Sequence, residues 1–290
     1  MTYEIRRARP LLGTIVEIRA GARTPARAER ALRTGFAAIA RVHALMSFHE
    51  PTSDLSRLNR HAAQRTVRVH AWTYRVLRHA RELHAKTGGL FDIATAPALV
   101  RGGWLPRTTP ALPRAGATAA DIKLLPARRV RFSRPLLLDL GGIAKGFAVD
   151  QAVAALRRAG ATAGVVNAGG DLRVFGGRNE RIHVRLPGSP GQLVALAELR
   201  AGAGATSAHY FSRRRLRGQW RTPIVDPRRH RPAGEARSVT VFARECWLAD
   251  ALCKVVWLAG ANARPLLAAC GACARVLKAP ARREARRRAT

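Results

Sequence analysis

The spacing of apolar residues along the chain predicts several amphipathic helices. Between residues 25 and 46 an apolar side chain recurs every three or four positions, and Thr24-Pro25 in front of this run is typical of a helix start. The same period predicts a helix over 73–87, which ends at Gly88-Gly89, and a largely apolar, buried helix over 247–258. The face of the first helix that we expect in the core consists of Ala28, Leu32, Phe36, Ile39, Val42 and Met46.

Alternation of apolar and polar residues predicts strands between these helices. The clearest run covers residues 12–20, another covers 163–167, and a short helix expected over 263–269 precedes a last strand at 274–277. Further short runs, typical of an antiparallel sheet, cover 181–186, 194–199, 224–225 and 238–243. The sequence therefore predicts an α/β (mixed α+β) fold in which helices flank a mixed or antiparallel sheet.

Two segments without apolar periodicity are predicted to be loops. Residues 47–59 are polar, with room for one short helical turn that Ser53 could cap at its N-terminus. Residues 102–120 are rich in Gly, Pro, Thr and Ala, and we expect them at the surface.

The stretch from Leu136 to Ala152 lies near the middle of the chain and combines several signals. Leucines around Asp139 predict a buried strand, Gly141-Gly142 predicts a turn, and apolar residues at helical spacing follow. A strand, turn and helix in this order direct backbone N–H groups and the positive end of a helix dipole to one point, where Lys145 adds a cation. Such a point can hold a phosphate, although an ordinary crossover between strand and helix has the same pattern.

The composition is that of a folded protein with an unusual charge. The 290 residues are 47% hydrophobic and carry a formal net charge of +34, almost all of it from arginine, because the chain has only five lysines. This charge could attract nucleic acid or an anionic membrane surface without specificity. Arginine and alanine are frequent even in the predicted loops, which indicates a compositional bias, and no nucleic-acid-binding motif accompanies the charge. We therefore predict no specific nucleic-acid partner.

The remaining bulk features favour a cytoplasmic protein. No run of 18 apolar residues is present, so we expect no membrane span, and the first ten residues are polar rather than typical of a signal peptide. The four cysteines all lie in the last 45 residues, at spacings that do not suit a four-cysteine zinc site, and we predict buried free thiols.

Five short stretches combine glycine or a small residue with polar side chains next to predicted strands. Glycine pairs let a ligand approach the backbone closely, and neighbouring carboxylates suit a hard cation bound together with phosphate oxygens. Each stretch alone is a common turn, but five in one chain indicate a ligand site. They are Phe91–Thr95, Asp139–Gly142 with Lys145, Asn167–Asp171, Ala205–Ser207 and Asp226-Pro227.

The order of these motifs resembles that in the FAD:protein FMN transferases, the ApbE-like flavin transferases. The resemblance extends from about residue 10 to residue 278 and rests on the ordered set rather than on any single motif. It includes Gly13-Thr14, Met46-Ser47, Ser53 to Asn59, Gly88 to Asp92, Asp139 to Gly146 with Asp150, Asn167 to Asp171, Ala205 to Ser207, Asp226 to Arg228, Ser238 to Val241, and Ala249 to Leu252.

The resemblance implies an activity and an architecture. Family members bind FAD and a divalent cation, usually magnesium, and transfer FMN to a threonine hydroxyl of a target flavoprotein, with release of AMP. Their fold is a single two-lobed α/β unit with the flavin in a cleft between the lobes. For this chain we accordingly expect one such domain over residues 1–278, followed by a basic, disordered tail over residues 279–290.

The resemblance also assigns roles to individual residues. The Gly142 carbonyl and the Asp250 carboxylate would bind the metal ion. The residues implied in binding of FAD are Met46, Ser47, His49, Phe91, Asp92, Lys145, Asn167, Gly169, Gly170, Asp171, Thr206 and Ser207.

Two departures from the family pattern affect the predicted chemistry. Pro223 stands where active relatives carry a histidine proposed to act in the transfer, so His209 or His230 would have to supply the base, and Asp226 is the third candidate catalytic residue. Lys254 stands where the family has a threonine that binds the metal, and it lies one helical turn after Asp250, at the spacing of an ion pair. An ammonium group competes with a metal cation instead of binding it.

Smaller changes are His49 in place of a common tyrosine, Ala208 in place of glycine, and Arg229-His230 in place of Thr-Gly. Two hypotheses therefore remain open. The chain either still transfers FMN, or it is a weakened member that binds FAD or another adenine nucleotide while Lys254 supplies the positive charge of the metal.

Overall fold

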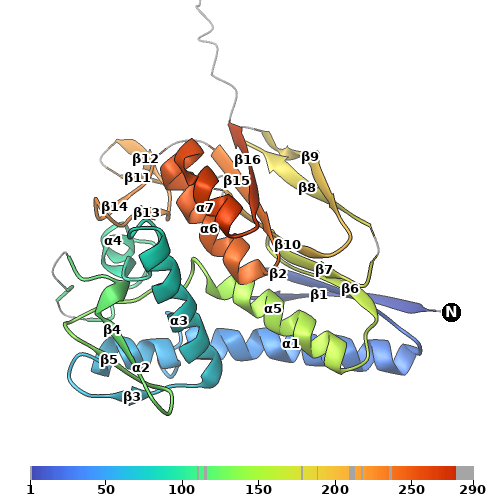
Figure 1. The fold of residues 1–290 in the computed structure, drawn as a ribbon, viewed down its shortest axis with the longest axis horizontal. Coiled ribbons are helices and arrows are strands. Elements are labelled where there is room, and N and C mark those ends of the chain that lie inside the picture. The colour runs from blue at the N-terminus through green and yellow to red at the C-terminus, as the bar shows by residue number, and fades with distance from the viewer. Residues whose placement is uncertain are drawn as a thin grey trace, which may run out of the picture.

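The computed structural model describes residues 2–109, 111–113, 116–177, 179–187, 189–208, 213–216, 218–234 and 237–278. Its centre is a seven-stranded sheet in which all neighbouring strands run antiparallel, as the alternating pattern predicted (Figure 1). In spatial order the strands are β1 (Tyr3–Leu11), β2 (Thr14–Ala22), β6 (Ala163–Ala168), β7 (Asp171–Phe175), β10 (Gly202–Ala208), β15 (Arg237–Ala243) and β16 (Cys273–Lys278).

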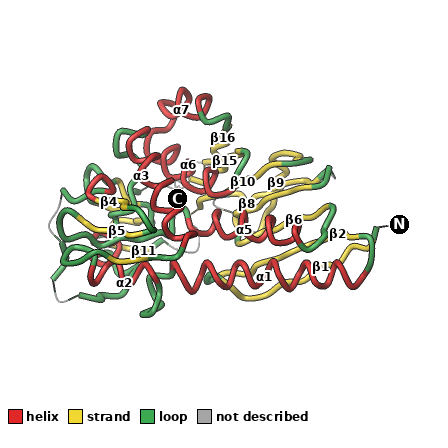
Figure 2. The backbone as a smooth tube through the Cα atoms, turned by 60° about the horizontal axis from the view of Figure 1, so that its bottom comes forward, coloured by secondary structure: helices red, strands yellow, loops and turns green. Residues whose placement is uncertain are grey.

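Three helices pack side by side on one face of this sheet. They are α1 (Pro25–Met46) over β1 and β2, α5 (Ala144–Arg158) over β6 and β7, and α6 (Cys246–Ala259) over β10 and β15 (Figure 2). The Thr24 side chain caps α1 by accepting a hydrogen bond from the Arg27 amide, and the predicted apolar face of the helix is buried. Apolar burial along these three helices forms the core behind the sheet.

A second lobe lies beside the large sheet and contains a small one (Figure 1). Its strands pair in the order β3 (Val67–Arg68), β5 (Arg129–Phe132) and β4 (Ile122–Leu125), and all of them are antiparallel. Ser53 caps the short helix in this lobe, as predicted, by accepting a hydrogen bond from the Ser56 amide. The helices are α2 (Asp54–His61), α3 (Ala71–Lys86), α4 (Ala96–Arg101) and the 3-10 turn η1 (Ala119–Asp121).

Three two-stranded hairpins and a short helix complete the described chain. The alternating runs at 181–186 and 194–199 pair with each other instead of joining the large sheet. The hairpins are β8 (Glu180–Leu186) with β9 (Ser189–Leu199), β11 (Arg214–Leu216) with β12 (Gln219–Arg221), and β13 (Val225–Asp226) with β14 (Arg231–Pro232). The 3-10 turn η2 (Gly260–Ala263) and helix α7 (Arg264–Ala269) precede β16. No helix in the described ranges has the length and apolarity needed to cross a bilayer.

One sequence-based expectation about strands was wrong, and one strand was not predicted. The buried strand expected around Asp139 does not exist: the leucines at 136–138 and 140 are buried, but residues 136–140 belong to no strand. Their backbone is held instead by the Asn59 side chain, which bonds both the amide and the carbonyl of Leu138, and by the Ile93 carbonyl. Strand β1 was not predicted: it lies at the edge of the sheet, pairs with β2, and leaves most of its side chains exposed.

Helices α5 and α6 cross closely, and this crossing positions the functional residues. A Cβ atom on Gly146 would lie 2.3 Å from the Cys246 carbonyl oxygen, so only glycine permits the approach. Each helix then supplies a carboxylate to the start of the other. Asp150 of α5 accepts the amides of Cys246 and Trp247 at 3.0 and 2.9 Å, and Asp250 of α6 accepts the Gly146 amide at 3.1 Å.

Candidate functional site

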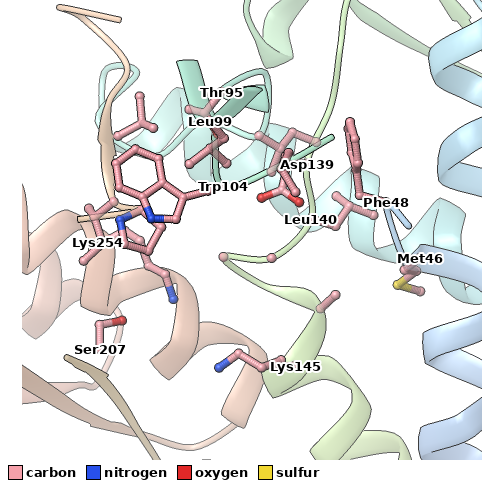
Figure 3. A pocket seen from close by; sticks show the side chains of 18 of the residues that line it. Met46, Phe48, Thr95, Leu99, Trp104, Asp139, Leu140, Lys145, Ser207 and Lys254 are labelled. Carbon is pink, nitrogen blue, oxygen red and sulfur yellow. The ribbon is translucent and has the colours of Figure 1, made fainter. Parts of the chain in front are cut away.

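A cavity of about 810 Å³ lies beside this crossing and draws its lining from both lobes. Figure 3 shows Trp104 and Leu99 on one side of it, Met46 and Phe48 on the other, the Asp139 carboxylate between them, and the side chains of Lys254 and Lys145 below. The cavity thus combines apolar and aromatic side chains with a few charged groups, which is the pattern expected for a small-molecule site.

Lys145 enters the cavity from the first turn of α5. Its ammonium donates to the Asp171 carboxylate at 2.5 Å, and the Asp171 side chain is 1% exposed at the start of β7. Burial would lower the pKa of Lys145, but the carboxylates of Asp171 and Asp250 outweigh this effect and raise it above its ordinary value. Lys145 is therefore a fixed cation.

Lys254 enters the same cavity from α6, one helical turn after Asp250. Its ammonium donates to the Asp250 carboxylate and to the Asp250 backbone carbonyl, the latter at 3.0 Å, which confirms the predicted ion pair. Burial would raise the pKa of Asp250, but the Lys254 and Lys145 ammonium groups outweigh it and hold that pKa below its ordinary value.

Asp139 is the carboxylate that faces the two lysines from the extended segment before α5 (Figure 3). Burial raises its pKa above the ordinary value, while the Gly141 amide, His49 and Lys254 act in the opposite direction. The turn at Gly141-Gly142 and the start of α5 form a corner of the cavity, although no strand precedes the turn, and the phosphate site expected there stays a prediction.

The turn between β6 and β7 borders the cavity next to this corner. Gly169 and Gly170 both have a positive φ, of 64° and 101°, and the Asn167 side chain accepts the Gly170 amide at 2.9 Å. A Cβ atom on Gly169 would lie 2.5 Å from the Thr14 hydroxyl oxygen, so glycine is required there. Gly169 lines the cavity, whereas Asn167 shapes the turn from behind.

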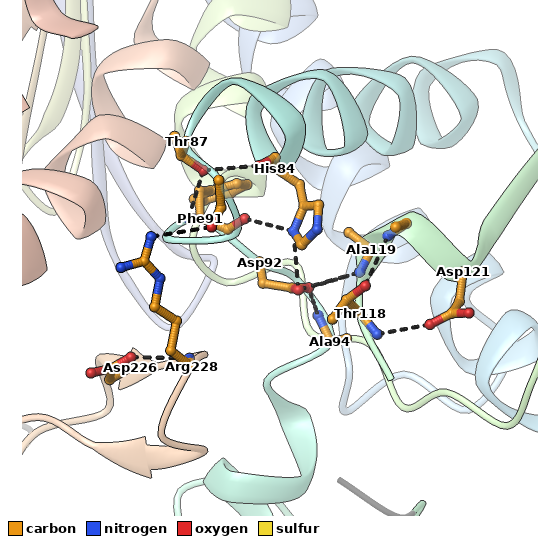
Figure 4. A network of polar contacts seen from close by, with 12 residues as sticks. His84, Thr87, Phe91, Asp92, Ala94, Thr118, Ala119, Asp121, Asp226 and Arg228 are labelled. Atoms are coloured by element: carbon orange, nitrogen blue, oxygen red, sulfur yellow. Dashed lines mark hydrogen bonds and ion pairs between the residues drawn. The ribbon is translucent and has the colours of Figure 1, made fainter. Parts of the chain in front are cut away.

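One wall of the cavity is fixed by a network around Asp92 (Figure 4). The Asp92 carboxylate accepts the amides of Ala94 and Ala119 and lies 3.1 Å from the His84 Nδ1 atom. The hydrogen bond to Asp92 raises the pKa of His84, because it favours the charged imidazole more than burial disfavours it. Asp92 therefore acts as an anchor that holds the buried Phe91 ring against the cavity.

The segment 222–232 forms the rim of the cavity next to this wall. Pro223 lines the cavity, so the position that carries histidine in the family pattern does face the site. Asp226 accepts the amide of Arg228 within its own turn, and Arg228 donates to the Gly88 carbonyl, which ties the rim to the wall (Figure 4). His230 lines two smaller pockets next to the cavity but not the cavity itself.

The structure brings most of the predicted ligand-binding residues together. Those that line the cavity are Met46, Ser47, His49, Phe91, Asp92, Gly142, Lys145, Gly169, Thr206 and Ser207. Asn167, Gly170, Asp171 and Asp250 lie behind them as hydrogen-bonding or charged partners. His209 lies outside the described residues, and Asp226 and His230 do not line the cavity, so their catalytic roles stay predictions.

The sequence interpretation missed one apolar side of the cavity. Trp104 and Leu105 line it together with Leu99, although the stretch 102–120 was expected to be a surface loop. A tryptophan between glycines and prolines was the available signal, because a large aromatic side chain in a loop usually has a partner to pack against.

The donor atoms present do not fit the predicted magnesium ion. One Asp250 carboxylate oxygen accepts from Lys254 and the other from the Gly146 amide. A Cβ atom on Gly142 would lie 3.5 Å from Lys254 Cε, so the lysine side chain occupies the space beside the predicted carbonyl ligand. Within the described part of the chain, no group of three or more His, Cys, Asp or Glu side chains could hold a metal. An ammonium group therefore stands where the cation was expected.

The cysteines are free thiols, as predicted, but only two of them are buried. Cys246 and Cys253 are fully buried and donate to backbone carbonyls of β10, and burial raises the pKa of Cys253 to about 12. Cys270 is partly exposed and Cys273 exposed, because α7 and β16 lie at the edge of the large sheet. The thiols of Cys246 and Cys253 are therefore expected to be unreactive at neutral pH.

Comparison with known proteins identifies relatives in sequence. The profile of the ApbE family matches residues 12–275. A FAD:protein FMN transferase of Rhodobacter capsulatus is 32% identical over 222 residues, which cover 72% of this chain and 42% of that protein. One of Vibrio cholerae is 28% identical over 222 residues, covering 71% of this chain and 66% of that protein. The chain thus spans less than two thirds of the length of both relatives.

Comparison of structures identifies the same fold. An ApbE protein of Thermotoga maritima superposes with a TM-score of 0.79 at 24% identity, covering 96% of this chain and 97% of that one. The apo form of a Pseudomonas stutzeri flavinyl transferase, ApbE, superposes with a TM-score of 0.79 at 20% identity, covering 94% of this chain and 90% of that one.

Proposed function

The chain belongs to the ApbE family, and we propose that it is an FAD:protein FMN transferase that moves FMN from FAD to a threonine hydroxyl of a target flavoprotein and releases AMP. The relatives in sequence carry this activity in their names. The observation that carries the proposal for this chain is the cavity with two fixed lysines between apolar sides.

The cavity suits FAD in both shape and charge. Its volume of about 810 Å³ lies within the usual range for small-molecule sites, roughly 300–1,000 Å³. The apolar sides at Trp104 and at Met46 can each hold a flat ring system, and Lys145 and Lys254 are placed to bind the pyrophosphate that joins them. The glycine turns at 141–142 and 169–170 let the ligand approach the backbone.

The proposed transfer is one displacement at phosphorus. The acceptor hydroxyl oxygen forms a bond to the FMN phosphorus, the bond from that phosphorus to the bridging oxygen breaks, and AMP leaves with the bonding electron pair. The hydroxyl proton passes to a base or to water. Lys145 and Lys254 would stabilise the charge on the phosphoryl oxygens, and Asp171 and Asp250 hold the two ammonium groups in place.

The site lacks the histidine that the family pattern places at position 223 to accept the proton. Pro223 cannot accept a proton, and among the described residues His43 and His49 are the imidazoles that line the cavity. Absence of a positioned base typically lowers a rate by about 10²–10⁴-fold and does not abolish it. The second candidate function, binding of FAD without efficient transfer, is favoured by Pro223 alone.

Mass measurement on a defined acceptor tests the proposal. The full chain is incubated with FAD and a flavoprotein domain that an established family member modifies, with and without magnesium. We expect an FMN adduct on the acceptor and an equal amount of AMP. A domain whose acceptor threonine is changed to alanine is the control and should stay unmodified. Neither adduct nor AMP, with tight binding of FAD, would leave the binding function in its place.

We further propose that residues 1–278 act as one functional unit. The cavity takes its lining from Leu12 at one end of the chain to Lys254 near the other, so neither lobe contains a complete site. A fragment ending before α6 would lack Lys254 and the Asp250 carboxylate. We expect such a fragment to lose FAD binding entirely.

A further inference from the structure

We propose that the Lys254 ammonium group is a built-in replacement for a divalent cation, so that this chain binds the pyrophosphate of its nucleotide without a metal ion. The proposal rests on the proposed function for the identity of the ligand, FAD, and concerns how that ligand is held.

The position of Lys254 is fixed by its own helix. Its ammonium is bonded to both the carboxylate and the backbone carbonyl of Asp250, and Asp250 is 1% exposed and also accepts the Gly146 amide. An ammonium has three donors, and within the described chain two of them are used, both by Asp250. The third remains for a ligand.

The cavity receives two ammonium groups whose own partner carboxylates lie behind them, and the Asp139 carboxylate faces the two groups inside it. Lys145 and Lys254 both line the cavity, whereas their partners Asp171 and Asp250 do not. The two lysines enter from different helices, α5 and α6, whose relative position the crossing at Gly146 determines (Figure 3). A pyrophosphate linker carries two negative charges, and two ammonium groups held on a rigid support match them.

The same geometry occupies the two metal ligands that the resemblance implies among the described residues, Gly142 and Asp250. Both Asp250 carboxylate oxygens have donors, and the Lys254 side chain lies beside Gly142. The neighbouring Cys253 cannot substitute as a ligand, because its thiol faces the Ala205 and Val239 carbonyls in the core. A divalent cation at Asp250 would have to displace an ammonium group that is already bonded there.

Titration of FAD into the full-length protein, followed by flavin fluorescence, tests the proposal by binding alone. We expect the Kd in excess EDTA and in excess magnesium to agree within about twofold, because the ammonium provides the charge in both cases. A loss of affinity of about tenfold or more in EDTA would overturn the proposal.

Variants at Lys254 make the test specific. In Lys254→Thr a hydroxyl replaces the ammonium, and we expect FAD affinity to become dependent on magnesium and to fall in EDTA. Because Lys254→Met alone would leave Asp250 buried without its partner, the neutral pair Asp250→Asn/Lys254→Met is the second variant. Its affinity should fall by about 10- to 100-fold in both buffers. Unchanged affinity in both variants would overturn the proposal.

A matched control and a control for the ligand complete the design. Lys123→Met removes a lysine that is exposed on β4, in the other lobe, and should leave affinity unchanged. If folded wild-type protein binds FAD only with magnesium, the lysine proposal fails and the proposed function stands. If it binds FAD under neither condition, the proposed function fails as well.

Discussion

Two parts of the cavity differ in how they are built: the floor, where α5 and α6 cross, and the rim, which residues 222–232 form. At the floor, α5 and α6 cross at Gly146 and exchange carboxylates, so that Asp150 and Asp250 are buried and each bonds the other helix. At the rim, residues 222–232 form a short hairpin in which Asp226 organises its own turn and partly faces solvent. The Asp250 carboxylate is thus fixed at the floor by contacts with the other helix, whereas the Asp226 carboxylate at the rim is bonded within its own turn.

This difference separates binding from chemistry. The floor holds two cations that a pyrophosphate can meet without rearrangement, because their positions belong to two packed helices. The rim holds the position at which the family pattern places its histidine, and here a proline occupies it. A chain can therefore keep the binding half of the site while the reactive half changes, since the two halves do not share their structural supports.

Removal of the Asp250 carboxylate, which bonds both Lys254 and the Gly146 amide, should have the largest effect on stability. Asp250→Ala leaves Lys254 without its counter-ion and the buried Gly146 amide without an acceptor, and we expect a loss of roughly 3 kcal/mol in the free energy of unfolding. Urea denaturation of wild type and variant measures it. A loss below about 1 kcal/mol would show that the floor is no more rigid than the rim.

The close approach of the two helices is tested next. In Gly146→Ala the added Cβ would lie 2.3 Å from a backbone oxygen of α6, so the helices must separate. We expect a loss of about 1–3 kcal/mol, as for other overpacked sites, together with weaker FAD binding because Lys145 and Lys254 move apart. Gly191→Ala on β9 is the control for glycine replacement, because nothing lies within 4 Å of its added Cβ and its φ is not positive, and it should cost less than Gly146→Ala.

The stability that the cavity wall gains from the pair of His84 and Asp92 should depend on pH. The pKa of His84 is raised above its ordinary value of 6.5 by its hydrogen bond to Asp92. A raised folded-state pKa means that charged His84 adds stability below about pH 6.5, and this contribution disappears as the pH rises through the folded-state value. His84→Gln should therefore cost about 1–2 kcal/mol at acid pH and less at about pH 9. A cost that does not change with pH would contradict the role assigned to the ion pair.

The smallest effect is expected at the rim itself. Asp226→Ala removes a hydrogen bond within one exposed turn and a loose ion pair with Arg229, so the free energy of unfolding should change by less than about 1 kcal/mol. Binding of FAD should be unchanged, because Asp226 does not line the cavity. A loss comparable to that of Asp250→Ala would contradict the contrast between rim and floor.

Pattern and propensity predicted local elements well. The sequence predicted the apolar face of α1, the cap at Ser53 and the start of α5 after Gly141-Gly142. These features depend on apolar period, capping residues and glycine turns, which act within a few residues of each other. The prediction of a strand around Asp139 was wrong because a local pattern does not show which distant groups the backbone of that segment bonds. A buried apolar run shows only that a segment is enclosed, and here Asn59 and Ile93, distant in sequence, satisfy its backbone.

The sequence by itself determined the family pattern, the amphipathic helices and the i,i+4 spacing that pairs Asp250 with Lys254, since these depend on residue order alone. Only the tertiary structure decided that Asp150 and Asp250 cap each other's helices, that Trp104 closes the cavity, and that His230 lies outside it. These features arise where segments separated by many residues meet, and their distances depend on how the helices and sheets pack.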